Sequence, residues 1–244
     1  MWRQPPRLSR ERSEGRHPRP AAQDLCHTSS MSHPSRARDL AELILGYGVI
    51  VGVIWTPERL QRIFSPMVLV LTLLVVLVRR PSRDELGLGW RCLIPSLWIL
   101  AAAIVLTAAS MFVAAKIGTL HPLYKPDFGH VAGYLLWTIY QQFLMQDYFM
   151  DRLLRLVSSE STAVALAGVL FAAAHLPNLV LTAATMVWGV VSCALFQRYR
   201  NLWALGLAQG LLGLGVAICV PDALHHHLRV GLGYLRYHGT QPVP

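Results

Sequence analysis

The fold of this chain is decided by the segment CLIPSLWILAAAIVLTAASMFVAA, which occupies residues 92–115. The segment contains no charged side chain, and a helix of this length, rising 1.5 Å per residue, crosses the roughly 30 Å hydrocarbon core of a bilayer. Backbone N–H and C=O groups in hydrocarbon must bond to one another, so a single spanning segment has to be a helix. The segment therefore predicts a transmembrane helix in an integral membrane protein.

Six shorter apolar segments accompany it, at Leu40–Trp55, Ile63–Val78, Val131–Met150, Ser161–His175, Leu179–Phe196 and Leu202–Val220. Hydrophobic residues make up 54% of the 244-residue chain and charged residues 14%, against roughly 25% charged residues in soluble domains. We therefore predict an all-α, polytopic transmembrane helix bundle of about seven spans, with limits of six and eight. An eighth would be a re-entrant or interfacial segment within Ala223–Tyr237.

The basic side chains are spread unevenly, and their distribution predicts the orientation of the bundle. With the N-terminus in the cytoplasm, the cytoplasmic segments carry sixteen of the 22 Lys and Arg residues and the outer segments carry six. Cytoplasmic loops of membrane proteins are enriched in Lys and Arg, so this bias favours seven spans. Because the basic residues flank the spans, we expect membrane lipids as partners and no nucleic acid, despite a net charge of +9.

The composition divides the chain into three regions. Residues 1–38 are rich in Arg, Pro, Ser and His without periodicity, which predicts a disordered basic tail. Met31 is an alternative to Met1 as the first residue of the protein. Residues 39–220 hold the apolar segments and form the transmembrane domain, and residues 221–244 form a C-terminal tail.

Polar side chains interrupt the segment 131–150. Gln142 and Gln146 are four residues apart and share one face of a helix, while Gln141 lies on a neighbouring face. Amides inside a membrane bundle either form a polar site or link helices by hydrogen bonds worth about 0.6–2 kcal/mol each. Both interpretations stay open on the residues alone.

A charged stripe continues the same helix. Asp147, Asp151 and Arg155 are spaced by four residues and run toward the cytoplasmic side. Opposite charges at this spacing form ion pairs on helix surfaces. The stripe therefore predicts a solvated helix end that carries an ion pair.

Two more polar groups lie in apolar segments, where such groups are expensive and mark candidate sites. His175 is followed by Pro177, which breaks the helix. A neutral imidazole there can be a general base, a metal ligand or a hydrogen-bonded packing residue. Gln209 lies in the last span, where Gly206 and Gly210 form a GxxxG pair that permits close helix packing.

The order of these motifs resembles the CPBP family, which contains the CAAX prenyl endopeptidases and the related bacteriocin-processing intramembrane proteases. That family carries a Glu-Glu-x-x-x-Arg motif, then Phe-x-x-x-His, then a His-x-x-x-Asn-like motif. The corresponding positions here are Gln141, Gln142, Gln146, Phe171, His175, Gln209 and Gly213. The likeness is specific over a core at 131–213 and extends to the LGL segment at 86–88.

The resemblance implies an endopeptidase that acts on prenylated or hydrophobic membrane peptides. It places His175, Gln141, Gln142 and Gln209 at catalytic positions and Gln146, Phe171 and Asn178 at substrate-binding positions. In the family the first glutamate activates water, and histidines assist it or hold a metal. An amide cannot accept a proton at physiological pH. Zinc is the cofactor that the family implies, but glutamine is a poor zinc ligand, so the ligand set is incomplete and no metal ligand is assigned.

Three functional hypotheses stay open. In the first, the chain is a peptidase in which His175 is the base. In the second, it is a catalytically inactive family member that binds a lipid or peptide or scaffolds a partner. In the third it is a small transporter, although the sequence shows no internal repeat of the kind that many transporters contain. In each case we expect an integral protein of a bacterial inner membrane.

Overall fold

The computed structural model describes residues 35–79, 81–90, 92–124 and 126–237, and every regular element in these ranges is helical. The elements are α1 (Arg36–Ile54), α2 (Glu58–Leu77), α3 (Leu93–Ile117), α4 (Phe128–Phe143), the π-helix η1 (Leu144–Met150), α5 (Asp151–Leu156), α6 (Glu160–Ala173), α7 (Leu179–Tyr199), α8 (Leu202–Cys219), α9 (Asp222–His225) and α10 (Gly231–Leu235). The all-α prediction is confirmed. Of the predicted N-terminal tail, residues 1–34 lie outside the described part.

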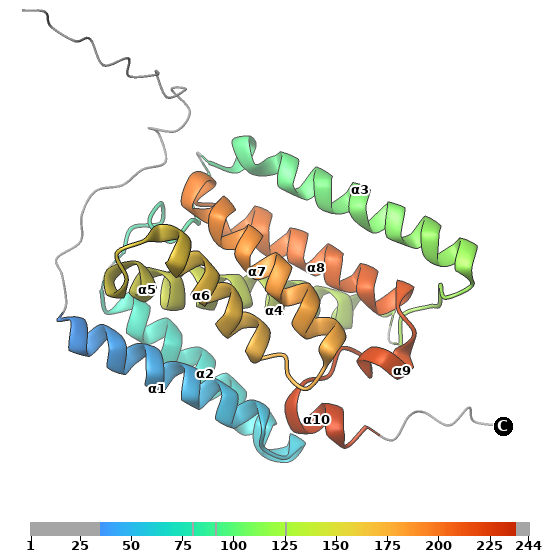
Figure 1. The fold of residues 1–244 in the computed structure, drawn as a ribbon, viewed down its shortest axis with the longest axis horizontal. Helices are drawn as coiled ribbons and strands as arrows, with labels where there is room; N and C mark the ends of the chain where they lie inside the picture. Colours follow the sequence, from blue (N-terminus) through green and yellow to red (C-terminus); the bar gives the residue numbers. More distant parts are fainter. Residues whose placement is uncertain (1–34, 80, 91, 125, 238–244) are drawn as a thin grey trace, which may run out of the picture.

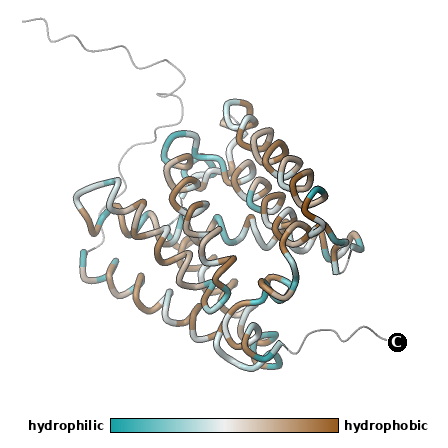
Figure 2. Tube along the Cα trace, turned by 45° about the vertical axis from the view of Figure 1, so that its right-hand side comes forward, coloured by the Kyte–Doolittle hydropathy of each residue, from teal (hydrophilic) through white to brown (hydrophobic). Residues whose placement is uncertain are grey.

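Four of these helices are long and apolar enough to cross a membrane, namely α2, α3, α7 and α8. Helix α6 is also apolar but has only 14 residues. Apolar colouring follows the helices, and polar colouring gathers at several of the turns (Figure 2). The integral membrane bundle is therefore confirmed, whereas the count of about seven spans stays a prediction.

Helix α8 lies at the centre of the bundle, packed against α3 and α4, and α3 runs along it at one edge of the molecule (Figure 1). The contact with α4 is close, because a Cβ on Gly206 would lie 2.7 Å from Ile139 Cα. A Cβ on Gly210 would lie 3.0 Å from the hydroxyl of Thr138, which itself donates to Gly206 O at 2.9 Å. The GxxxG pair therefore brings α8 against α4.

Side-chain caps begin the three helices that follow α5. Ser159, Asn178 and Asn201 each accept a backbone N–H in the first turn of α6, α7 and α8. Such caps satisfy amides that have no partner within the helix. Pro177 lies in the turn between Ala173, where α6 ends, and the start of α7. The predicted helix break at this proline is present.

The helix that carries the glutamines is longer than predicted. The sequence predicts a span that ends at Met150, but the backbone stays helical through α4, η1 and α5 as far as Leu156. All seven residues of η1 are buried. A π-helical turn changes which side chains share a face, and such turns occur frequently at functional sites. The α1–α2 hairpin packs beside this part of the helix.

Candidate functional site

Four glutamine side chains from α4, η1 and α8 form one hydrogen-bonded chain in the interior, which we call the amide network. Gln209 Nε2 donates to Gln141 Oε1 at 2.5 Å, and Gln142 Nε2 donates to Gln209 Oε1 at 2.6 Å. Gln146 Nε2 donates to Gln142 Oε1 at 3.0 Å. Gln142, Gln146 and Gln209 are buried. The fold thus brings together the glutamines of two motifs that lie more than sixty residues apart.

Trp188 on α7 sets the direction of the amide network. Its indole N–H can only donate, and it lies 3.1 Å from Gln209 Oε1. That oxygen is therefore the acceptor for both Trp188 and Gln142, which leaves Gln209 Nε2 to donate to Gln141. Gln141 consequently uses its oxygen in the network, and its Nε2 forms no hydrogen bond among the described residues.

A cavity of about 650 Å³ lies beside the amide network, and we call it the main cavity. Its wall includes Gln141 and Gln209, with Trp188 from α7, Phe171 from α6 and His175 from the turn after α6. Most of the remaining wall is made of aliphatic and aromatic side chains from α1 to α4 and from α6 to α8. Apolar cavities of about 300–1,000 Å³ with a few polar groups are typical ligand sites.

His175 lies in the turn after α6 and is half-buried. Its Nδ1 is 2.7 Å from Phe171 O. A carbonyl oxygen only accepts, so Nδ1 carries the proton in this contact and Nε2 presents a lone pair. No hydrogen bond to Nε2 forms in the described part of the chain. The imidazole can therefore accept a hydrogen bond or a proton from a group in the main cavity.

Three predicted site residues do not line the main cavity. Gln142 and Gln146 are buried within the amide network. Asn178 is fully buried, and its Nδ2 donates to the carbonyl oxygens of His225 at 2.8 Å and Arg229 at 2.9 Å. Its amide therefore ties the α6–α7 turn to the C-terminal segment, and a direct contact of these three residues with a ligand stays a prediction.

The start of α1 and the helix α5 lie at the same end of the bundle (Figure 1). Charged side chains from both helices pair there, and we call them the ion-pair cluster. Its members are Asp39 and Glu42 on α1, Arg79 after α2, and Asp151, Arg152 and Arg155 on α5. Arg152 is fully buried and contacts Glu42 at 2.5 Å. Arg155 binds Asp39 through two N–H groups, at 2.9 and 2.8 Å. The cluster connects the α1–α2 hairpin to the helix that carries the glutamines.

Asp39 is 1% exposed. Burial by itself raises the pKa of its carboxyl, but the hydrogen bonds and charges of Arg155 and Arg79 outweigh that effect and lower the pKa below its ordinary value. Asp147 differs, because it is buried in η1 and forms no ion pair within the described ranges. The predicted stripe is therefore solvated and paired only in its later part, where Asp151 contacts Arg155 at 2.7 Å.

The side chains around His175 do not fit a zinc ion. Zinc sites in proteins use three or four ligands drawn from Cys, His, Asp and Glu. The motif partners of His175 in the main cavity, Gln141 and Gln209, are neutral amides. Across the residues that the structure describes, no three His, Cys, Asp or Glu side chains lie together as a metal site.

The fold and the site define a class of protein, the intramembrane helix bundles in which polar motifs from several helices meet beside an apolar cavity. A family model described as type II CAAX prenyl endopeptidase Rce1-like matches residues 50–214. This match covers more than half of the chain, and the chain belongs to that family. The resemblance inferred from the motifs is thereby confirmed. No curated protein and no solved structure matches the chain.

Proposed function

We propose that this chain binds the prenylated or hydrophobic end of a membrane peptide in the main cavity and does not hydrolyse it. The observation that carries the proposal is the direction of the amide network, because it leaves the Nε2 of Gln141 free for a ligand. Among the residues that line the cavity, none is Asp or Glu. The cavity therefore offers a hydrogen-bond donor but no carboxylate to activate water.

The polar groups of the main cavity complement a peptide group. Each peptide unit has one N–H donor and one carbonyl acceptor. Gln141 Nε2 can donate to the carbonyl, and the unprotonated Nε2 of His175 can accept from the N–H. The apolar wall then takes a hydrocarbon chain, for which burial contributes about 0.8 kcal/mol per CH₂.

Hydrolysis with His175 as the base is the second candidate, and the lone pair on His175 Nε2 favours it. In this reaction Nε2 takes a proton from water while the water oxygen attacks the carbonyl carbon of the scissile bond. Gln141 Nε2 donates to the developing oxyanion. The imidazolium then returns the proton to the leaving nitrogen as the C–N bond breaks, which leaves a carboxylic acid and an amine.

Cleavage and binding of a quenched, prenylated peptide by purified protein in liposomes separate the two candidates. For the proposed function we expect saturable binding without cleavage by the wild type, weaker binding by Gln141→Leu, and no cleavage by His175→Ala. Wild-type cleavage that disappears in His175→Ala would establish the second candidate. The Gln141→Glu/Gln209→His double variant restores two family side chains, and cleavage by it alone would support a site that has kept binding and lost catalysis.

We also propose an orientation, with the N-terminus in the cytoplasm of a bacterial cell and the protein in the inner membrane. The distribution of Lys and Arg supports it. The ion-pair cluster then lies at the cytoplasmic face, and α9 and α10 lie at the outer face. Trp90 and Phe128 are exposed on opposite predicted sides. A cysteine introduced at Phe128, but not one at Trp90, should react with an impermeant reagent added outside intact cells.

A further inference from the structure

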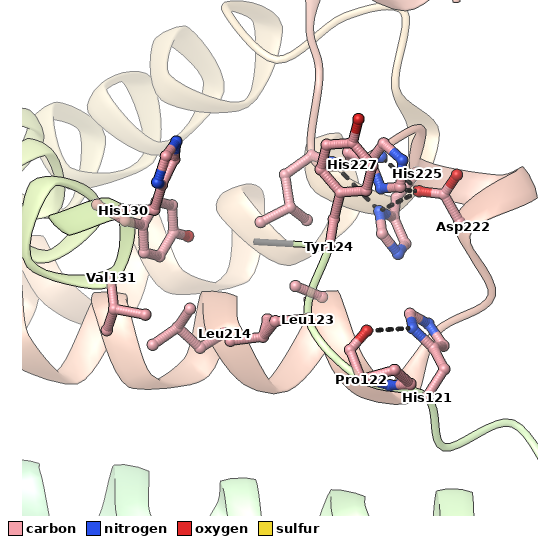
Figure 3. Close-up of a pocket in the computed structure, with 13 residues that line it drawn as sticks. His121, Pro122, Leu123, Tyr124, His130, Val131, Leu214, Asp222, His225 and His227 are labelled. Atoms are coloured by element: carbon pink, nitrogen blue, oxygen red, sulfur yellow. Dashed lines mark hydrogen bonds and ion pairs between the residues drawn. The ribbon is translucent and has the colours of Figure 1, made fainter. Parts of the chain in front are cut away.

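A second cavity, of about 480 Å³, adjoins the main cavity near α9, and we call it the histidine pocket. His130 on α4 lies across this space from His225 and His227 (Figure 3). Tyr134 and Leu228 line both cavities. These two side chains therefore form the boundary between the main cavity and the histidine pocket.

Three histidines of this pocket are engaged by the protein itself. Both ring nitrogens of His121 lie 2.9–3.2 Å from backbone carbonyl oxygens. Those of His225 contact one carbonyl oxygen and one backbone N–H, and those of His227 contact Asp222 and Tyr237. These nitrogens are therefore not free to bind a metal or an anion. Much of the remaining wall is aliphatic, so the pocket can extend the apolar space of the main cavity.

Tyr134 occupies a defined place on this boundary. It lies on α4 seven residues before Gln141, which is about 10 Å along the helix axis and on the same face. On α8, Gly213 lies four residues after Gln209. A Cβ on Gly213 would collide with the hydroxyl of Tyr134 and lie 3.0 Å from its Cζ. The tip of the phenol ring therefore fills the notch that the glycine leaves on α8.

Helices α4 and α8 thus meet the main cavity at two levels. At one level Gln141 bonds to Gln209, and at the other the ring of Tyr134 packs over Gly213. The hydroxyl of Tyr134 forms no hydrogen bond among the described residues, and the side chain is half-buried. Packing against Gly213 holds the ring of Tyr134 in place. The ring therefore affects the main cavity through the space that it occupies.

We propose that Tyr134 sets the length of the hydrocarbon chain that the main cavity accepts. This inference rests on the proposed function, in which the peptide group binds at Gln141 and the chain extends toward Tyr134. A chain that reaches Tyr134 fills the main cavity. A longer chain has to enter the histidine pocket, and the ring of Tyr134 stands in the way.

The test uses fluorescent peptides whose cysteine carries a geranyl, farnesyl or geranylgeranyl group, titrated against the full chain in nanodiscs. We expect the wild type to lose about tenfold or more in affinity at the first chain that is too long, as expected when a pocket rejects a larger homologue. Tyr134→Ala should abolish this loss by joining the two cavities. Tyr134→Phe keeps the ring and is the matched control, so it should keep the wild-type ranking.

A second variant tests the same inference in the opposite direction. In Gly213→Ala the added methyl group pushes the phenol ring out of its notch and into the main cavity, so the preference should move to a shorter chain. If the wild type binds none of the three peptides, the proposed function is overturned together with this inference. If it binds them but ranks them equally, or if Tyr134→Ala and Gly213→Ala keep its ranking, only the role of Tyr134 is overturned.

Discussion

The amide network and the ion-pair cluster both have members on the continuous α4–η1–α5 helix, yet one is neutral and the other is charged. Among the described residues, Gln142 bonds to the amides of Gln209 and Gln146, and the indole of Trp188 donates to Gln209. Arg152 instead donates to Glu42 and to Tyr148 O. Arg79 and Arg155 bind the carboxylates of the cluster, several of which keep some contact with solvent. Transferring an ion from water into the interior costs several kcal/mol even after relaxation, whereas a paired amide costs far less.

This difference separates two tasks. The ion-pair cluster joins α1 to α5 at one end of the bundle. Charged side chains can be placed there because water and several opposite charges lie close to each of them. The amide network forms part of the wall of the main cavity, where an unpaired charge would lose its hydration when an apolar ligand binds, at a large cost in free energy. The charged region should therefore dominate stability, and the neutral region should dominate binding.

The largest expected effect is on Arg152. Replacing it by Met removes two N–H contacts with Glu42 and one with Tyr148 O, all of them buried or partly buried. Breaking a buried ion pair by removing one partner costs about 3–5 kcal/mol. Glu42 keeps Arg38 and Arg79 as partners in this variant. We therefore expect Arg152→Met to lower the free energy of unfolding by about 3 kcal/mol, the low end of that range, measured by reversible unfolding in mixed micelles.

Arg152→Lys is the matched control for this prediction. Lysine keeps the positive charge but cannot reproduce the planar fork that contacts Glu42. It should therefore recover only part of the lost stability. A loss of less than about 1 kcal/mol in Arg152→Met, the range of exposed ion pairs, would show that the ion-pair cluster does not hold the two helices together.

Asp39 gives the second effect, and it depends on pH. Two charge-assisted hydrogen bonds join it to Arg155, and bonds to charged groups contribute about 1.5–3 kcal/mol. The pKa of Asp39 is lowered from its ordinary value of 3.8. Its stabilisation is therefore complete above that value and is lost as the pH falls through the folded-state pKa.

Unfolding of the wild type and of Asp39→Asn between pH 3 and pH 7 measures this dependence. The difference in the free energy of unfolding between the wild type and Asp39→Asn should stay constant from pH 7 to about pH 5, and it should shrink at lower pH. A gap that widens on acidification would mean that burial, which raises the pKa, outweighs Arg155 and Arg79.

The two regions were not equally accessible from the sequence. The helical spans were predictable because apolar runs and a bilayer leave no alternative to helices. Gln142 and Gln146 were predicted on one helix face, and the bond between them is present at 3.0 Å. The sequence does not pair them with Gln209 on α8, because periodicity within one helix carries no information about which distant helix packs against it.

The ion-pair cluster was mostly missed. Asp151 and Arg155 were predicted to pair, but Asp39 and Glu42 lie more than a hundred residues earlier in sequence than their α5 partners. The only signal in the sequence is the presence of these two acids at the start of the apolar segment Leu40–Trp55. The role of Trp188 in directing the amide network was also not predicted, since an indole N–H has no preferred partner until tertiary structure places one.

The third effect is smaller and does not change with pH. Gln142→Leu removes two amide hydrogen bonds and leaves the Nε2 of Gln146 without its partner, while Gln209 Oε1 keeps the indole of Trp188. We expect a loss of about 1–2 kcal/mol. The loss should be equal at pH 4 and pH 7, because no group of the amide network titrates in that range. A difference between the two values would mean that a titrating group acts on the network.

The smallest effect is expected at Glu58 and Arg62, an i,i+4 pair in α2 with a contact of 2.8 Å between two largely exposed side chains. This distance is similar to those in the ion-pair cluster. The pair therefore differs from the cluster mainly in its exposure to solvent, and the comparison measures the effect of burial on stability. Exposed pairs gain little, because water screens the charges and the long side chains lose rotamer freedom on pairing. Glu58→Gln should therefore unfold like the wild type in the same micelles, at both low and high salt. If Glu58→Gln instead lost as much stability as Asp39→Asn, close contact alone would account for the strength of the buried pairs. Burial would then not explain the contrast between the amide network and the ion-pair cluster.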